Sequence, residues 1–394
     1  MERLECPIRG YAWGSRTAIA RIQGRPVPSP EPEAEMWVSA HPAAPSTVDG
    51  VPLTDRIAVD PTGTLGTRVV DRFGARLPFL MKLLAAEAPL SLQAHPDPAQ
   101  AAAGFAAEEE AGIPRDAPHR RYVDPFHKPE LLVAVSEFRA LCGFRDPDAS
   151  ADLLAGLGVP ALDPVVAHLR DGDLAGAVAR LLPGGATAPP QAEVAAAAAD
   201  RDGPYGLVGE LAAAYPDDPA VVMALLLNQV TLAPGEAIFM PAGNLHMYLS
   251  GVAVEIMAAS DNVLRGGLTT KYVDATELLR VLRFETLDDP VRHAVPVAPG
   301  VVGWPVPVAE FALHRVDLDD RRPRVDVALS APCAVLCLAG TVYVDDGVAP
   351  VTLGSGEAGF GQVRHPGAPA GATEQAGRRL ALSGNGTAFL ASVR

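Results

Sequence analysis

The sequence predicts a mainly β protein with one helical insertion. The chain has 394 residues, enough for two to three domains of about 150 residues each. Its 38 prolines and 37 glycines are scattered and separate short apolar runs, a pattern typical of many-stranded β structure. Between about residues 146 and 227, Ala- and Leu-rich segments carry apolar residues at spacings of three and four, as helices do. We therefore expect β structure on both sides of a helical domain.

These patterns divide the chain into three predicted domains. Residues 1–145 and 227–290 form one β domain, which a helical domain at 146–226 interrupts. Residues 291–394 form a second β domain. A Gly- and Pro-rich stretch near residues 184–191 is expected to link two helices of the insertion.

Local signals predict the individual elements. Residues 1–92 alternate short apolar runs with turns, which favours strands. Asp97 is expected to cap a helix that continues to Ala111. An amphipathic pattern predicts a short helix from Asp274 to Phe284, and after Pro296 the pattern is strand and turn to the end.

Composition argues against several partners and compartments. The chain has 32 Lys and Arg against 47 Asp and Glu, a net charge of −15, which disfavours nucleic acid or an anionic membrane surface as the main partner. No apolar window of about 18 to 20 residues predicts a membrane-spanning helix. The segment MERLECPIRG lacks the apolar stretch of a secretory signal, and the four cysteines are too sparse for a disulfide framework. We expect a cytoplasmic, monomeric protein.

One segment has the spacing of a metal-binding turn in a β barrel. Gly235, Pro241, Gly243 and His246 form the pattern G-x5-P-x-G-x-x-H, in which two turns place His246 at the start of a strand. This pattern resembles the second motif of the cupin superfamily, whose members are double-stranded jelly rolls that often carry a metal. The resemblance implies two cupin-like jelly-roll β domains plus an α-helical domain.

Three further side chains are candidate metal ligands. Gln93 and His95 are two residues apart, so on a strand they share one face at a separation of about 6.6 Å. Glu130 lies in a polar turn that leads into an apolar strand, where a surface acid is the alternative interpretation. His127, in the same turn, is interpreted as a turn residue. Two imidazoles, one carboxylate and one amide oxygen suit Zn²⁺ but also accept Co²⁺, Mn²⁺ or Fe²⁺.

Longer motifs resemble type I mannose-6-phosphate isomerases (phosphomannose isomerases) along most of the chain. The resemblance implies a zinc-dependent aldose–ketose isomerase that interconverts mannose 6-phosphate and fructose 6-phosphate and serves mannose metabolism and GDP-mannose supply. The motifs that carry it are YAWGS at 11–15, AEMWVSAHP at 34–42, LPFLMKLL at 77–84, LSLQAHPDP at 90–98, HKPEL at 127–131, ALCGF at 140–144, GNLHMYLSG at 243–251 and VEIMAASDNVLRGGLTTKYVD at 254–274.

The resemblance also implies roles for individual residues. It assigns one Zn²⁺ per chain to Gln93, His95, Glu130 and His246, and the inclusion of Glu130 rests mainly on it. Lys82 is similar to a lysine that helps to hold phosphate, and Trp13 and Glu35 match positions lining the same cleft. The positions that match the substrate pocket are Ser91, Lys128, Glu255, Asp261, Arg265 and Lys271. Met247 departs from the family's small residue and is expected to narrow the pocket, whereas Thr270 replaces a proline before Lys271.

Isomerisation moves one proton between C1 and C2 through a cis-enediol(ate), so it needs a general base. Glu255 is our first candidate, because the apolar strand VAVEIMA would bury it and raise its pKa. It could instead orient a metal ligand or Arg265, and Lys128 or a metal-bound hydroxide are other candidate bases.

Cations near the base would stabilise the anionic substrate. Arg265 is expected to stabilise enediolate charge or to bind phosphate through its guanidinium fork, with Asp261 fixing its direction. Lys271, Lys82 and Ser91 are expected to supply further phosphate contacts.

Two other functions would use the same scaffold. A regulator that binds a phosphosugar without catalysis would not need Glu255, Arg265 and Lys128, which are all present. An oxygenase would favour two histidines and one carboxylate with open positions, so Gln93 as a fourth ligand disfavours it. The C-terminal domain contains His314 and His365 but no H-x-H or Q-x-H pair. We expect it to bind no metal and to wall the cleft.

Overall fold

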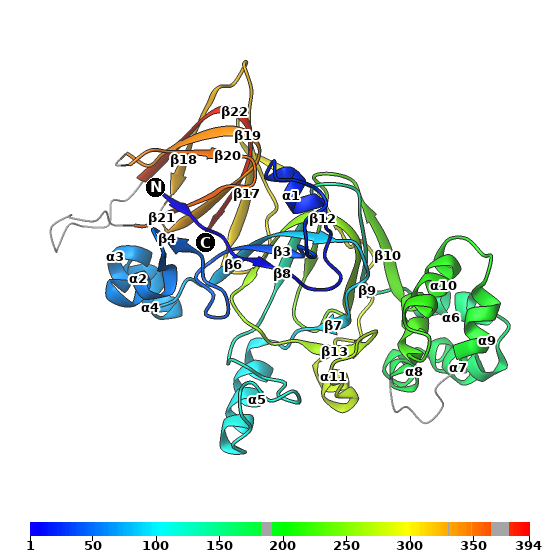
Figure 1. Cartoon of the computed structure of the whole chain (residues 1–394). Coiled ribbons are helices and arrows are strands. Elements are labelled where there is room, and N and C mark those ends of the chain that lie inside the picture. Colours follow the sequence, from blue (N-terminus) through cyan, green and yellow to red (C-terminus); the bar gives the residue numbers. More distant parts are fainter. Residues whose placement is uncertain (183–190, 330, 348, 364–377) are drawn as a thin grey trace.

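The computed structural model describes residues 1–182, 191–329, 331–347, 349–363 and 378–394. These residues contain two large antiparallel sheets, and a group of helices stands at one end (Figure 1). This arrangement confirms the predicted fold class, which is mainly β with a helical insertion and two cupin-like β domains. The predicted linker near residues 184–191 lies outside the described residues except for Gln191, and so does His365.

The first sheet contains 11 strands within the described residues. Its main path has the order β14-β11-β8-β12-β6-β3-β2, and β12 also pairs with β7 and β9, which in turn pair with β13 and β10. Its strands are β2 (Ile8–Arg9), β3 (Glu35–Val38), β6 (Phe79–Ala86), β7 (Leu92–Ala94), β8 (Glu130–Ala134), β9 (Phe138–Phe144), β10 (Leu227–Leu232), β11 (Ala237–Met240), β12 (His246–Ala258), β13 (Leu264–Gly267) and β14 (Val291–Arg292).

The long strand β12 joins the two halves of this sheet. Its first residues pair with β7 and β9, and its second half, from Gly251 on, pairs with β6. Gly251 has φ +127°, and a Cβ there would lie 2.6 Å from the carbonyl oxygen of Glu137. Glycine therefore allows the strand to change partners where a side chain would not fit. As a result, both ends of β12 contribute residues to the same site, since Tyr248 near its start contacts Glu255 near its end.

The second sheet contains nine strands within the described residues. Its path is β1-β21-β19-β22-β17-β16-β15, with β18 beside β22 and β20 beside β19. The first strand of the chain therefore pairs with the sheet of the C-terminal part. The strands are β1 (Glu2–Leu4), β15 (Val295–Ala298), β16 (Val301–Gly303), β17 (Ala312–Leu318), β18 (Arg324–Leu329), β19 (Cys333–Asp345), β20 (Val351–Gly354), β21 (Ala358–Gly361) and β22 (Arg378–Ser392); β4 (Thr47–Val48) and β5 (Val51–Pro52) pair separately.

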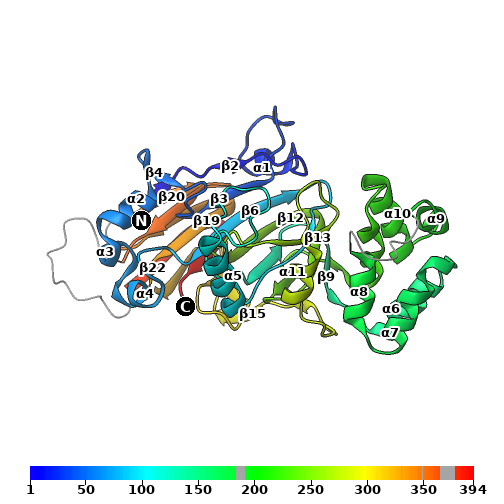
Figure 2. The ribbon, with the colours of Figure 1, turned by 90° about the horizontal axis from the view of Figure 1, so that it is seen from below.

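The helical insertion lies beyond β9 and β10, at one end of the molecule in both views (Figures 1 and 2). Aspartates cap two of its helices, since the side chains of Asp146 and Asp173 accept from Ala149 N and Gly176 N. Its elements are α6 (Pro147–Ala155), η1 (Pro160–Leu162), α7 (Asp163–Arg170), α8 (Leu174–Leu181), α9 (Gln191–Ala198), α10 (Pro204–Ala214) and η2 (Pro219–Leu225). Within the described ranges, every helix is too short or too polar to cross a membrane.

Both helices predicted in the first β domain are present. Helix α5 (Pro98–Glu110) has a full capping box between Asp97 and Gln100, and α11 (Ala275–Val281) begins after Asp274. The sequence pattern missed four short helices, because five to seven residues bounded by Pro or Gly show too little periodicity. These are α1 (Ala18–Ile22), α2 (Leu53–Val59), α3 (Pro61–Leu65) and α4 (Thr67–Phe73).

A shared apolar core joins the two large sheets. Leu83 and Val254 of the first sheet belong to the same buried cluster as Leu336 and Phe389 of the second. Because side chains alternate along β6, Lys82 points away from this core, to the opposite face of the first sheet. The C-terminal sheet therefore supports the first sheet from the side opposite Lys82.

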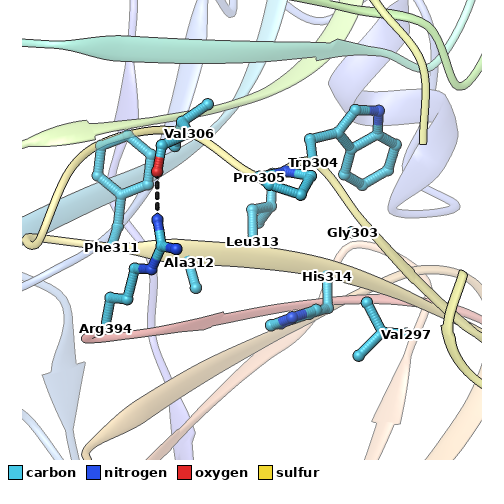
Figure 3. A pocket seen from close by; sticks show the side chains of 10 residues that line it. All are labelled: Val297, Gly303, Trp304, Pro305, Val306, Phe311, Ala312, Leu313, His314 and Arg394. Carbon is cyan, nitrogen blue, oxygen red and sulfur yellow. Dashed lines mark hydrogen bonds between the residues drawn. The ribbon is translucent and has the colours of Figure 1, made fainter. Parts of the chain in front are cut away.

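A small pocket of about 170 Å³ lies beside the loop between β16 and β17 (Figure 3). Trp304 belongs to the shared core and donates its indole N–H to Gly235 O at 3.2 Å, and Arg394 donates to Val306 O. The polar side chains in its lining include His314 but no carboxylate group. The lining residues are Val297, Gly303, Trp304, Pro305, Val306, Phe311, Ala312, Leu313, His314 and Arg394.

Candidate metal centre and active site

His95, Glu130 and His246 meet at the mouth of the first β domain. His95 follows β7, Glu130 begins β8 and His246 begins β12. His95 Nε2 lies 3.3 Å from Glu130 Oε1, and His246 Nε2 lies 3.3 Å from Glu130 Oε2. All three residues are buried, and one ligand atom from each lies within 4.8 Å of the others. Three of the four predicted metal ligands therefore form one compact group.

Backbone carbonyls orient both imidazoles towards Glu130. His95 Nδ1 lies 2.7 Å from Asn262 O, and His246 Nδ1 lies 3.1 Å from Asn244 O. Since a carbonyl oxygen only accepts, each Nδ1 carries the proton and each Nε2 presents a lone pair. Burial lowers the pKa of His95 to about 4, so this imidazole is neutral at pH 7.

The group fits a divalent metal ion. His95 Nε2 and Glu130 Oε2 are buried and have no hydrogen-bond partner. Burial raises the pKa of Glu130, but Lys128 and His95 more than offset that effect, so its pKa lies well below the usual range and it is ionised. Two converging imidazole nitrogens and a carboxylate, with one of the nitrogens and one of the carboxylate oxygens unsatisfied, are a donor set that zinc and similar metals take.

Gln93 lies at the edge of this group. In the sheet register it stands opposite His246 on β12 and opposite Arg265 on β13. Its side-chain Nε2 is 3.4 Å from His246 Nε2. A half-turn of the amide would present the oxygen at that position instead. Its role as a fourth ligand stays a prediction.

Glu255 and Lys82 form a buried ionic group beside the metal-binding group. They are cross-strand neighbours on β12 and β6, with Lys82 Nζ 3.5 Å from Glu255 Oε2 and 3.2 Å from Glu35 Oε1. Burial raises the pKa of Glu255 to about 7, although Lys82 opposes the rise. Burial would lower the pKa of Lys82, but Glu35 and Glu255 raise it overall, so it remains a cation. The tyrosine hydroxyl of Tyr248 donates to Glu255 Oε1 at 2.7 Å.

Lys128, the alternative base, touches the metal-binding group directly. Its Nζ lies 3.0 Å from Glu130 Oε1, and the side chain is buried. His127, the residue before Lys128, points elsewhere and pairs with Glu310 of the C-terminal part at 2.7 Å. The turn therefore presents Lys128 to the site while His127 contacts the neighbouring domain.

Two cations stand near the site with no acidic partner. Among the described residues, no carboxylate lies at ion-pair distance from Arg265 or Lys271. Arg265 lies on β13 (Leu264–Gly267), and Lys271 lies in the exposed loop that follows this strand. Burial, together with Arg265, lowers the pKa of Lys271. The expected pairing of Asp261 with Arg265 was wrong, because the Asp261 carboxylate lies 3.5 Å from His41 Nε2.

The remaining predicted residues lie around the same region. Glu35 accepts from Trp37 Nε1 at 2.7 Å as well as pairing with Lys82. Trp13 stacks on Tyr11 and packs beside the apolar cluster that contains Tyr248. Ser91 is partly buried in the loop just before β7.

One expectation about the pocket was wrong, and one residue was missed. Met247 does not narrow the pocket, because it packs with Leu245 and Leu249 in the core facing the helices, on the strand face opposite His246. The sequence did not single out Tyr248 as a site residue, although it lies on the same strand as His246 and Glu255 and within the motif GNLHMYLSG at 243–251.

Fold and site together define a cupin-like protein with a His–Glu–His group suited to a divalent metal. The protein-family model for the catalytic domain of type I phosphomannose isomerase matches residues 1–147 of this sequence. The chain is 38% identical over 373 residues to mannose-6-phosphate isomerases of Shigella flexneri and Escherichia coli, covering 91% of this chain and 94% of each relative. The chain belongs to the mannose-6-phosphate isomerase family.

A solved structure agrees along the whole chain. The mannose 6-phosphate isomerase of Salmonella typhimurium, bound to substrate (f6p) and zinc, has a TM-score of 0.88 and 35% sequence identity. The match covers 100% of this chain and 99% of that one.

Proposed function

We propose that this chain is a zinc-dependent isomerase that interconverts mannose 6-phosphate and fructose 6-phosphate. The observation that carries the proposal is the buried His95–Glu130–His246 group with unsatisfied ligand atoms, next to a carboxylate, Glu255, whose pKa is near working pH. The relatives' shared activity, and the zinc and fructose 6-phosphate of the Salmonella structure, support the same conclusion.

His95, Glu130 and His246, with Gln93 as a fourth ligand, would hold one zinc ion per chain. When bound, zinc supplies a Lewis acid that stabilises negative charge on the substrate's oxygens. The ligand residues are prepared for the metal, because each imidazole directs Nδ1 to a backbone carbonyl and Nε2 to Glu130, and Glu130 is ionised.

Glu255 is the proposed general base. As a carboxylate it accepts the C2 proton of the aldose, which leaves a cis-enediolate, and it returns that proton to C1 to give the ketose. The C2–H bond breaks and the C1–H bond forms, the hydroxyl proton moves from O2 to O1, and the carboxylate is regenerated. Lys82 and Tyr248 hold the carboxylate in place through contacts at 3.5 Å and 2.7 Å. Lys128 is the second candidate, because it also lies at the metal-binding group.

Arg265 and Lys271 are the proposed anion-binding residues. Both lack an acidic partner among the described residues, so their charge is available to a phosphate or to the enediolate. This local positive charge explains how a protein of net charge −15 can bind a dianion, because nearby charges dominate within a Debye length. Ser91, Lys82, Asp261, Trp13 and Glu35 are proposed to line the same cleft.

The second β domain, residues 291–394, is proposed to bind no metal and to support the catalytic domain. The shared apolar core between the two sheets supports this role. The cytoplasmic location and the monomeric state stay predictions.

A coupled assay of mannose 6-phosphate turnover tests the function. We expect activity to be lost with a chelator and restored by zinc, and to fall at least 100-fold in Glu255→Gln and in Arg265→Ala. Glu236→Gln and Arg324→Ala are matched controls, since both side chains lie at turns or edges away from the site, and they should keep parental activity. Full activity in both site variants would refute the mechanism. Oxygen consumption without isomerisation would instead indicate an oxygenase.

A further inference from the structure

Asn262 connects two segments that supply metal ligands. The residue is fully buried in the loop between β12 and β13, one residue after Asp261 and three before Arg265. Its backbone carbonyl accepts from His95 Nδ1 at 2.7 Å. This hydrogen bond keeps the proton on Nδ1 and leaves Nε2 to face Glu130.

The side chain of Asn262 holds the segment that leads to Lys128 and Glu130. Its Oδ1 accepts from Val123 N at 2.8 Å, and its Nδ2 donates to Asp124 O at 2.7 Å and to Phe126 O at 2.9 Å. Donors and acceptors of the amide are thus matched to backbone groups of residues 123–126. An amide suits this position because it offers both kinds of group.

Neighbouring side chains reinforce the same connection. Ser260 Oγ donates to Asp124 Oδ1 at 2.8 Å and accepts from Asn262 N at 3.2 Å. Asp124 Oδ2 accepts from Asp261 N at 2.8 Å. The two loops are therefore joined by hydrogen bonds, and Asn262 is the residue that also reaches His95.

We propose that Asn262 is a positioning residue for the metal centre. Through its carbonyl it fixes His95, and through its amide it fixes the approach to Glu130, so that both ligands have one common support. It touches neither the metal nor the substrate. This inference rests on the proposed metal centre.

Removal of the amide should weaken metal binding more than it weakens the fold. In Asn262→Ala, the N–H groups of Val123 and Asp124 and the carbonyl of Asp124 lose this partner, and the carbonyl of Phe126 keeps only Ser260 Oγ. We expect the 260–262 loop to shift as a result, and His95 with it. Loss of a residue that supports a metal ligand costs about 10- to 100-fold in metal affinity. Ser260→Ala removes a smaller part of the same network and should weaken zinc binding by about fivefold.

Asn228→Ala is the matched control. Asn228 is a partly buried asparagine whose Nδ2 faces four carbonyls, those of Cys142, Gly143, Phe144 and Leu287, and it makes no hydrogen bond to a metal ligand. We expect this variant to unfold at a lower temperature than the parent while its zinc dissociation constant stays within about threefold.

The experiment measures zinc affinity of the full chain by competition with a chromophoric chelator, with circular dichroism to confirm folding. The expected result is weakening in Asn262→Ala and Ser260→Ala but not in Asn228→Ala. If Asn262→Ala does not fold, Ser260→Ala decides. Unchanged affinity in the soluble variants, or an equal loss in Asn228→Ala, would overturn the proposal. Because zinc affinity is measured without substrate, a parent that binds zinc but does not isomerise would refute only the proposed function.

Discussion

Replacement of Tyr248 by phenylalanine should move the pH dependence of the reaction. The Tyr248 hydroxyl donates to Glu255 Oε1 at 2.7 Å, and both groups are buried. Burial and the nearby Glu255 raise the pKa of Tyr248 well above its usual range, so the hydroxyl remains a donor throughout the working pH range. This hydrogen bond stabilises the ionised form of Glu255, which is the form that accepts a proton.

The size of the effect follows from the strength of that hydrogen bond. A hydrogen bond to a charged group contributes about 1.5–3 kcal/mol. Its loss raises the pKa of Glu255 by roughly one to two pH units, since one unit corresponds to about 1.4 kcal/mol. Starting from a pKa of about 7, the variant titrates at about 8–9. At pH 7 the ionised fraction falls from about a half to about 1–10%, so kcat/KM should fall about 5- to 50-fold and recover towards pH 9.

The assay is kcat/KM for mannose 6-phosphate between pH 5.5 and 9.5, a range of about four pH units around the expected pKa. In the parent, activity should rise with pH around about 7, because protonation disables the base. Phe138→Leu is the control. The Phe138 ring packs edge-on against Tyr248, with ring centroids 5.5 Å apart, but it cannot donate a hydrogen bond to the Glu255 carboxylate. An acidic limb at the same pH in parent and Tyr248→Phe would refute the assignment of Glu255 as the base.

Three further predictions concern stability. Lys82→Met leaves Glu35 and Glu255 buried without their cation. The free energy of unfolding, measured in urea at pH 8, should therefore fall by about 3–5 kcal/mol. An unchanged free energy of unfolding would contradict the ion-pair contacts. Removal of metal with a chelator should lower the unfolding temperature. Addition of zinc at about 100 times its Kd should then raise the free energy of unfolding by about 2.7 kcal/mol. The same treatment should change the unfolding temperature of His246→Ala little. Asp97→Ala removes the capping box of α5 and should cost about 1 kcal/mol with unchanged kcat, because α5 carries no site residue.

Local patterns in the sequence predicted those parts of the molecule that depend on short-range physics. The helix after Asp97 follows from a cap and a run of alanines, and the observed α5 begins and ends within one residue of the prediction. The turn before His246 places it at the start of β12, as predicted, whereas Gln93 lies within β7 and His95 directly after it.

Contacts between distant segments were beyond such patterns. Nothing near Glu130 shows that its strand lies beside β12, so the resemblance to a family had to supply it. The pairing of Asp261 with His41 across 220 residues, rather than with its near neighbour Arg265, depends on how two loops fold back. Similarly, β1 joins the sheet of the C-terminal part through β21, more than 350 residues away, which no local signal indicates.

The most direct test of the central claim is X-ray absorption at the zinc edge of the zinc-loaded protein. We predict one zinc per chain with nitrogen and oxygen neighbours at about 2.0–2.2 Å, imidazole scattering, and loss of the ion in His246→Ala. Cys142 stands opposite His246 in the register, and burial raises the pKa of its thiol to about 12, which disfavours a thiolate ligand there. A sulfur neighbour at about 2.3 Å, or zinc retained without His246, would contradict the proposed centre.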